Sequence, residues 1–421
     1  MSSPASSPLL RLPTAQWTDI ILHLTADDLK SLRLIGTRES HLSAPPLTSH
    51  LQLRMDRAPF FLKDAECTEL ETGKWLANRR QLVIHDAHAP ICTRRVAYLI
   101  SRGYLNSISH IIVHHCRAHA HVVALLSTLS NVTCLELIDL GNPEEISSVR
   151  NRNDLEMMVA SLGKMSNLQT LDIEFDCVIS GRHLMFLQHL YKLKHLRLRG
   201  FDLSRGIENM ANLTELQSLH LCHGNFYCSP EEDVREADLL SFMNLKHVQN
   251  LHLEGFDCLS NTGLKPFSPS STMRNLTLKH CQEMGDDCLP CIGKMTELES
   301  LHIVNSAFDD IDIESFVSEN WLLLNDLQNL KRLSLFYVLV DQYDLLDLSG
   351  LTSLETLNIA FHDNMDPDAF EELCHSILPN FPNLKKLRIF SDEEGMEYSI
   401  QRGDIEIEFS TFNLGDDVEL D

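Results

Sequence analysis

A short apolar phrase recurs along most of the chain. It consists of an apolar residue, two arbitrary residues, a second apolar residue, one arbitrary residue and a third apolar residue, as in Leu193-x-x-Leu196-x-Leu198. The second apolar residue opens a closing doublet, and these doublets begin at positions 82, 111, 135, 171, 196, 219, 251, 276, 301, 333, 357 and 387. A phrase that returns at nearly fixed spacing predicts stacked structural units and not one globular core.

Each repeat is predicted to contain one strand and one helix. The two residues of a doublet are separated by one position, so both side chains point to the same face of a strand. Apolar residues with helical spacing follow, as in Leu184-Met185-x-Leu187-x-x-Leu190. Many steps between doublets, such as the step from 171 to 196, have the length of a leucine-rich repeat, about 20–29 residues. We therefore expect an α/β fold, a leucine-rich-repeat solenoid in which a curved parallel sheet carries outer helices.

A different pattern precedes the repeats. Pro13 can open a helix, because its missing N–H costs nothing in the first turn. The phrases Leu12-Pro13, Ile20-Ile21-x-x-Leu24 and Asp28-Leu29-x-x-Leu32-Arg33-Leu34 together resemble the F-box, a small all-α unit. The residues that match the docking positions of that family are Leu12, Pro13, Ile20, Ile21, Leu24, Leu29, Leu32 and Leu34.

An F-box-like start followed by leucine-rich repeats resembles the layout of F-box/leucine-rich-repeat proteins. The phrase Cys281-x-x-Met284-x-Asp286-x-x-Leu289 is similar to the cysteine-containing repeat of that family. The resemblance implies a non-enzymatic substrate receptor of an SCF-type ubiquitin ligase, with a Skp-type adaptor and a cullin–RING ligase as partners. An interaction scaffold without a ligase role is the alternative. A GTPase activator is a more distant alternative. The repeats of Ran-GTPase-activating proteins typically carry an Asn five residues after the doublet start, and no repeat of this chain has one there.

These patterns divide the chain into five parts. We expect a short disordered lead at residues 1–8, an F-box-like helical domain at 9–55 and a connector at 56–80. The leucine-rich-repeat domain, with about twelve repeats, is expected at 81–391, and an acidic C-terminal cap and tail at 392–421. Within the last part, Ile405-Glu406-Ile407-Glu408-Phe409 alternates as an amphipathic strand does, which predicts a strand that closes the final repeat.

Charge and cysteine content limit the partners. The chain has 35 Lys and Arg against 60 Asp and Glu, a formal net charge of −25, which disfavours binding to a nucleic-acid backbone. No apolar run approaches the length of a membrane span. The start of the chain has neither the basic nor the apolar segment of a secretory signal. The 12 cysteines show no disulfide framework. We therefore expect reduced thiols and a location in the cytoplasm or nucleus.

No catalytic signature and no closed metal site stands out, so we expect neither an enzyme nor a cofactor. His110, His114, His115, His119 and His121 gather near Cys116, but their spacing fits no closed zinc site. Cys288-x-x-Cys291 has the spacing of half a zinc site, but no second pair stands at a useful distance. We expect surface histidines in the first case and core packing in the second.

The inner face of the predicted sheet is the candidate binding surface. Side chains that alternate with the doublets point out of this face. Its basic and imidazole side chains, with two aromatic neighbours, are Lys194, Arg197, Arg199, His220, His252, Lys279, His302, Phe336 and Tyr337. We hypothesise that this band holds an acidic or phosphorylated segment of a target protein, with Arg197 and Arg199 as forked donors. Phe336 is the expected apolar anchor. The alternative is that these are ordinary solvated strand residues.

Overall fold

The computed structural model describes residues 50–54, 80–85, 96–114, 119–138, 149–223, 236–256, 259, 261–268, 272–281, 288–304, 321–336, 342–360, 375, 378–391 and 398–411. The chain divides into two compact units, residues 1–177 and 178–421, which we describe separately. None of the helices in the described ranges is long and apolar enough to span a membrane.

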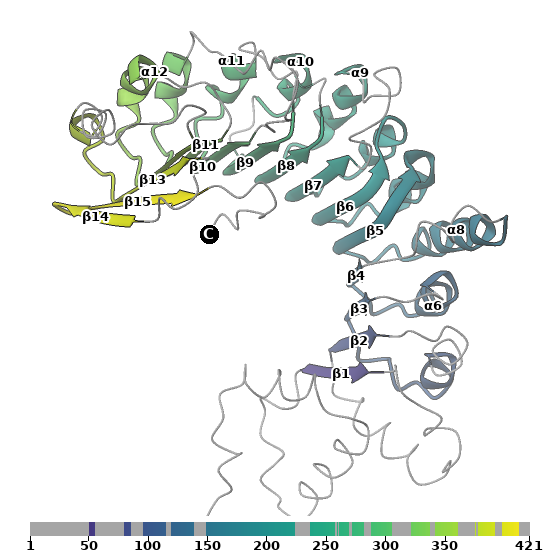
Figure 1. The fold of residues 1–421 in the computed structure, drawn as a ribbon. Coiled ribbons are helices and arrows are strands. Elements are labelled where there is room, and N and C mark those ends of the chain that lie inside the picture. Colours follow the sequence, from purple (N-terminus) through teal and green to yellow (C-terminus); the bar gives the residue numbers. More distant parts are fainter. Residues whose placement is uncertain are drawn as a thin grey trace, which may run out of the picture. The chain divides into compact units, whose positions relative to one another are not determined.

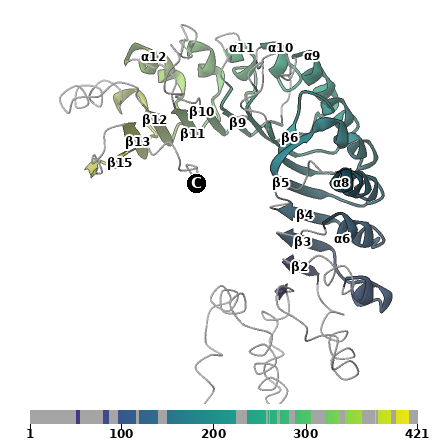
Figure 2. The ribbon, with the colours of Figure 1, turned by 45° about the vertical axis from the view of Figure 1, so that its right-hand side comes forward.

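The first unit contains parallel strands that are neighbours in sequence order. They are β1 (His50–Arg54), β2 (Gln81–His85), β3 (His110–His114), β4 (Cys134–Ile138) and β5 (Thr170–Ser180), whose last residues belong to the second unit. The helices α6 (His119–Leu126) and α8 (Val149–Leu162) lie on one side of these strands (Figure 2). Each helix follows one strand and precedes the next, as a parallel connection requires.

Strand β1 adds a doublet that the repeat pattern did not include. Leu51 pairs with Leu82 and Leu53 pairs with Ile84 in the parallel register of β1 and β2. The phrase Leu51-Gln52-Leu53 has the same alternation as the later doublets. The parallel sheet therefore starts before residue 81, inside the segment that the sequence pattern assigned to the helical domain.

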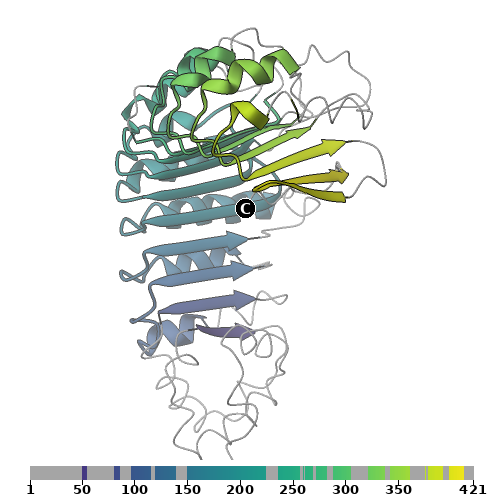
Figure 3. The same ribbon diagram turned by 90° about the vertical axis from the view of Figure 1, so that its left-hand side faces the viewer.

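The second unit is a larger curved sheet with short helices on its outer side (Figure 1). Its parallel strands lie side by side in chain order (Figure 3). They are β6 (His195–Asp202), β7 (Ser218–His223), β8 (Asn250–Glu254), β9 (Asn275–Lys279), β10 (Ser300–Val304), β11 (Arg332–Phe336), β12 (Thr356–Ala360) and β13 (Lys386–Ser391). The outer α-helices are α9 (Glu236–Leu239), α10 (Asn261–Leu264), α11 (Leu289–Ile292) and α12 (Gln342–Asp347). The predicted solenoid of strands and outer helices is therefore present.

The doublets form the core, as their spacing predicted. Every doublet residue from Leu82 in β2 to Ile389 in β13 is at most 2% exposed, and Leu253 in β8 is fully buried. Burying one such side chain contributes about 1.5–3 kcal/mol. The in-register pairing of neighbouring strands, for example Leu219 with Leu251, aligns the doublets into two continuous apolar rows.

Several outer helices are 3₁₀-helices and not α-helices. They are η2 (Gly181–His189), η3 (Ile207–Met210), η5 (Leu240–Asn244), η7 (Trp321–Asp326), η8 (Leu348–Gly350) and η9 (Leu378–Asn380). In η2, Leu184 and Leu187 are buried, and so is Leu190, which follows the helix. Their three-residue spacing matches the 3.0 residues per turn of a 3₁₀-helix, whereas Met185, one position off this row, is exposed.

Side-chain amides tie successive repeats together at the turn before the strand. Asn167 donates to the carbonyl of Ser130 at 3.0 Å, Asn329 to that of Thr296 at 3.1 Å, and Asn383 to that of Thr352 at 2.8 Å. Each bond satisfies a backbone carbonyl of the preceding repeat. Each of these asparagines stands directly before the first apolar residue of its phrase. This position differs from the one five residues after the doublet start, where no repeat has an Asn.

A two-stranded extension closes the sheet. The strand predicted at residues 405–409 is present as β15 (Ile405–Thr411), which pairs in parallel with β13 and antiparallel with β14 (Tyr398–Arg402). Glu408 of β15 accepts from Lys386 at 2.7 Å and from Arg388 at 2.8 Å. These ion pairs link the extension to the last repeat strand.

Candidate functional site

The inner face of the second unit is organised in rows that run across the strands. In the first row Arg197 of β6 pairs with His220 of β7, which pairs with His252 of β8. In the second row, two residues further along, Arg199 precedes Cys222 and Glu254. Neighbouring strands are about 4.8 Å apart, so side chains of adjacent repeats in one row are in contact distance.

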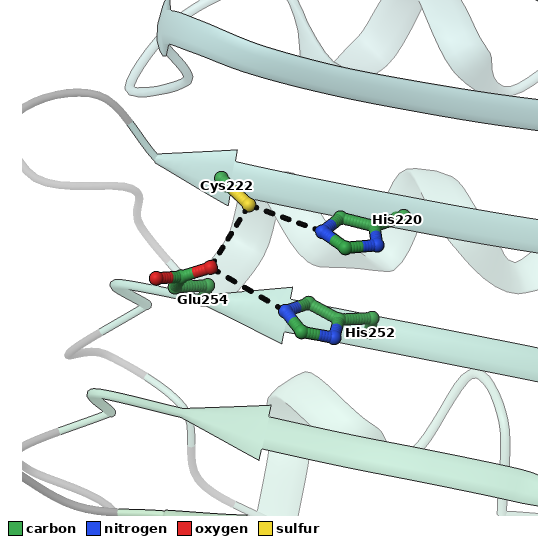
Figure 4. Close-up of side chains that lie close together, drawn as sticks. All are labelled: His220, Cys222, His252 and Glu254. Carbon is green, nitrogen blue, oxygen red and sulfur yellow. Dashed lines mark hydrogen bonds and ion pairs between the residues drawn. The ribbon is translucent and has the colours of Figure 1, made fainter. Parts of the chain in front are cut away.

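Four side chains of β7 and β8 converge in this region (Figure 4). The Nε2 atom of His220 lies 3.2 Å from the Sγ atom of Cys222, and the Cys222 thiol donates to Oε2 of Glu254 at 3.0 Å. The Nε2 atom of His252 lies 3.5 Å from the same Glu254 oxygen. One nitrogen, sulfur or oxygen atom from each residue lies within 4.8 Å of those of the other three. We call these four residues the β7–β8 cluster.

Burial and neighbouring charges set the protonation of the β7–β8 cluster. Burial, the adjacent His252 and the charge of Arg197 lower the pKa of His220 to about 3. Burial and the charge of Glu254 raise the pKa of the Cys222 thiol to about 12. Burial opposes ionisation of Glu254, but hydrogen bonds from His252 and Cys222 and the charge of Lys279 hold its pKa below the usual range. At neutral pH the cluster therefore contains a neutral His220, a thiol and a carboxylate.

The other oxygen of Glu254 faces a lysine of the next strand. The Nζ atom of Lys279 on β9 lies 3.7 Å from Oε1 of Glu254. Oε2 meanwhile faces Cys222 and His252. Lys279, predicted as part of a band that receives a partner's carboxylates, is thus in an ion pair within the chain.

A second polar network lies further along the same face. The Nε2 atom of His302 lies 2.6 Å from Oγ of Ser300, and its Nδ1 atom lies 2.8 Å from Oγ of Ser334. The amide of Asn358 donates to that Ser334 oxygen at 2.8 Å. Burial, with the charges of Arg332 and His252, lowers the pKa of His302 to about 4. His302 is therefore a buried, neutral residue of the sheet.

These findings remove His220 and His302 from the predicted cationic band. Burial lowers the pKa of His220 and of His302, so neither side chain is a cation at neutral pH. Lys194, Arg197 and Arg199 on or beside β6 are all half-buried, and Arg199 hydrogen-bonds the Cys222 side chain of the next strand. Arg197 and Arg199 are two positions apart on β6, which places both on the inner face.

Phe336, predicted as an accessible aromatic anchor, is buried. Phe336 is only 1% exposed, and its ring packs edge-to-face against Phe390 with centroids 5.0 Å apart. The ring is therefore part of the protein interior and presents no exposed apolar contact. Tyr337 lies outside the described residues. So do all the predicted adaptor-docking residues: Leu12, Pro13, Ile20, Ile21, Leu24, Leu29, Leu32 and Leu34.

The histidines near β3 that are neighbours in the sequence are not the ones that form a cluster in the structure. His110 bonds to Glu136 at 2.7 Å, and Cys134 lies 3.8 Å from the same carboxylate. His121 is exposed on α6. The structure thus gathers His110 with Cys134 and Glu136 from β4. Cys288 and Cys291 are buried, as predicted for core packing.

Cys222 and Glu254 are not among the site residues predicted from the sequence. Both stand directly after a doublet, where each follows a histidine by two positions, as His220-x-Cys222 and His252-x-Glu254. Two such phrases in consecutive repeats are the signal that predicts the cluster, because the repeat register superposes them.

Comparison with known proteins gives limited similarity. No protein-family model and no curated protein matches the chain. A chain in the crystal structure of the TLR13–ssRNA13 complex has 17% sequence identity and a TM-score of 0.46; the match covers 77% of this chain and 42% of that chain. A chain in the crystal structure of the Rad7 and Elc1 complex in yeast has 14% identity and a TM-score of 0.39, with coverage of 76% and 88%. The match thus spans less than half the length of the TLR13 chain. The fold described above rests on the chain's own strand order and register.

Proposed function

We propose that this chain is a non-catalytic protein-binding receptor of a cullin–RING ubiquitin ligase that acts in the cytoplasm or nucleus. Its N-terminal segment docks a Skp-type adaptor, and the inner face of its repeat sheet holds the target protein. The first part of this proposal rests on the F-box-like phrases at Leu12-Pro13, Ile20-Ile21-x-x-Leu24 and Leu29-x-x-Leu32. The second rests on the sheet of the second unit.

The observation that carries the target-binding part is the charge on β6. In a chain with a net charge of −25, Lys194, Arg197 and Arg199 place three cations within six residues beside an inner face. Arg197 and Arg199 project from the same face about 7 Å apart, the distance between alternate residues of a strand. Guanidinium groups bind carboxylate or phosphate through paired N–H donors. An acidic or phosphorylated segment of the target is therefore the expected ligand.

Binding of the purified full-length chain to a purified Skp-type adaptor tests the ligase role. We expect a complex with the wild-type chain and its loss with the double variant Leu12→Ala/Pro13→Ala. Matched far-ultraviolet circular dichroism and unfolding curves of the two proteins show that the repeats are intact. Absence of a complex with the wild-type chain contradicts the ligase role and favours an interaction scaffold.

Charge reversal on β6 tests the target-binding part separately. We expect Arg197→Glu/Arg199→Glu to lose capture of an acidic or phosphorylated target, and an unfolding curve of the variant shows whether its fold is kept. Arg205→Glu is the matched control, since Arg205 is an exposed arginine in the turn after β6. Capture by the double variant at the wild-type level contradicts this assignment.

A further inference from the structure

We propose that the β7–β8 cluster of His220, Cys222, His252 and Glu254 is a binding site for one divalent metal ion of the zinc class. Such a site goes beyond the receptor role and does not depend on it. It is a structural site that joins two consecutive repeats.

The register of the two strands supplies the geometry. His220 pairs with His252, and Cys222 pairs with Glu254, so the four residues occupy the corners of one small rectangle on the inner face. The two imidazole rings are stacked, with centroids 3.8 Å apart and planes 10° apart, and the Nε2 atoms of both rings face the thiol and carboxylate. The four side chains therefore lie side by side (Figure 4), and a tilt of the two nearly parallel rings directs both Nε2 atoms at one ion.

Three of the distances between ligand atoms are close to those of tetrahedral coordination. Zinc bonds of about 2.0–2.3 Å to nitrogen, oxygen and sulfur place neighbouring ligand atoms about 3.3–3.6 Å apart. Three contacts in the cluster are 3.0, 3.2 and 3.5 Å long, and the potential ligand atoms all lie within 4.8 Å of one another. The other pairs of ligand atoms, which lie within 4.8 Å, must draw together by as much as about 1 Å when an ion binds.

The donor set selects the class of ion. Two imidazole nitrogens and one thiolate sulfur favour zinc and similar transition metals, whereas magnesium and calcium prefer oxygen ligands. When the ion binds, the Cys222 S–H bond is replaced by a sulfur–metal bond and the proton leaves to solvent. A complete set of four protein ligands is typical of structural zinc sites, which leave no position for a substrate.

The surroundings of Glu254 orient its carboxylate for this role. Lys279 holds Oε1 at 3.7 Å, which leaves Oε2 directed at the other three ligands. A hydrogen-bonded or paired carboxylate keeps a fixed orientation, although the positive charge of Lys279 also opposes the charge of a bound cation. The group formed by His110, Cys134 and Glu136 on β3 and β4 offers only three ligands among the described residues, so it is the weaker candidate.

Metal titration of the full-length chain tests the proposal. The purified chain is first stripped with a chelator and then titrated with Co²⁺ as a spectroscopic substitute for Zn²⁺, followed by competition with Zn²⁺. We expect one tightly bound ion per chain with thiolate-to-cobalt charge-transfer absorption. Cys222→Ser is expected to lose that absorption and to weaken zinc binding by more than about tenfold. Cys281→Ser, which alters a buried cysteine next to β9, is the matched control and is expected to behave as wild type.

A measurement on the wild-type chain guards against a variant that does not fold. X-ray absorption at the zinc edge is expected to show one sulfur at about 2.3 Å and three nitrogen or oxygen ligands at about 2.0–2.2 Å. An environment of several sulfurs, which other cysteines of the chain would produce, overturns the assignment. So does unchanged charge-transfer absorption in a folded Cys222→Ser variant, or the absence of tight binding by the wild-type chain.

Discussion

His220 and His252 lie face to face across neighbouring strands, with ring centroids 3.8 Å apart and planes inclined by 10°. They are distant in sequence and adjacent only because β7 and β8 pair in register. The same register places every inner-face side chain beside its counterpart in the next repeat. The chemistry of this face is therefore set by rows across the sheet together with alternate residues along each strand.

The buried doublets carry the stability of the repeats. Leu253 is fully buried in β8, so we expect Leu253→Ala to lower the free energy of unfolding by about 2–5 kcal/mol, because it removes apolar contacts and leaves a cavity. Leu322→Ala is the control, since Leu322 on η7 is 57% exposed, and its effect is expected to be within about 0.5 kcal/mol. Denaturant unfolding of both variants measures the difference, and equal effects contradict the assignment of the core.

A close approach of two backbone segments requires glycine at position 206. Gly206 has φ of +96°, and a Cβ atom there would overlap the carbonyl oxygen of Gly181. Gly403 has a similar backbone, with φ of +64°, but nothing within 4 Å of the corresponding Cβ position. We expect Gly403→Ala to cost about 1–2 kcal/mol from backbone strain alone, and Gly206→Ala to cost more, because overlap adds to strain. Thermal unfolding of the two variants compares them; a smaller effect at Gly206 contradicts the overlap.

The buried His302 makes stability depend on pH. Its pKa is about 4 in the folded chain against an ordinary value of 6.5, so the unfolded chain binds the proton more tightly. This contribution is fully present above pH 6.5 and is lost as the pH falls from about 6.5 to 4. As the pH falls through this window, we expect the unfolding free energy of His302→Gln to decrease less than that of the wild-type chain. Denaturant unfolding at about pH 7 and about pH 5 measures the slope, and equal slopes in both proteins indicate that His302 is not the titrating group.

Ion pairs attach the terminal strand β15 to the last repeat. Glu408 contacts both Lys386 and Arg388, whereas Glu406 contacts Lys386 at 3.4 Å and no other basic residue in the described part of the chain. We expect Glu408→Gln to lower the free energy of opening of β15 by about 1 kcal/mol and Glu406→Gln to lower it less. Hydrogen exchange of the β15 amides at low salt reports the difference, which is expected to diminish in about 1 M salt because the charges are screened. A larger effect from Glu406→Gln contradicts the pairing.

The strands could be predicted from the sequence because each doublet places two apolar residues on one face. The outer helices were harder, since Leu184, Leu187 and Leu190 suit either an α-helix or a 3₁₀-helix, and the short connection selects the tighter form. Strand β1 was missed because Leu51-Gln52-Leu53 lacks the apolar residue three positions upstream, where the polar residue Thr48 stands.

The candidate site could be predicted only in part. The alternation in the strands placed His220, His252 and His302 on the inner face, but it gave neither their burial nor their protonation. Phe336 was expected to be accessible because its position in the repeat points to the open inner face, yet its ring packs against Phe390 two strands away. Cys222 and Glu254 acquire their significance only when β7 and β8 are in register.

One affinity purification tests the receptor role most directly. Tagged wild-type chain, Leu12→Ala/Pro13→Ala and Arg197→Glu/Arg199→Glu are recovered from the same cells, and the proteins that accompany each are quantified by mass spectrometry. We predict that the first double variant loses the Skp-type adaptor and keeps the target, whereas the second keeps the adaptor and loses an acidic or phosphorylated target. Recovery of the same partners by all three proteins would contradict both assignments.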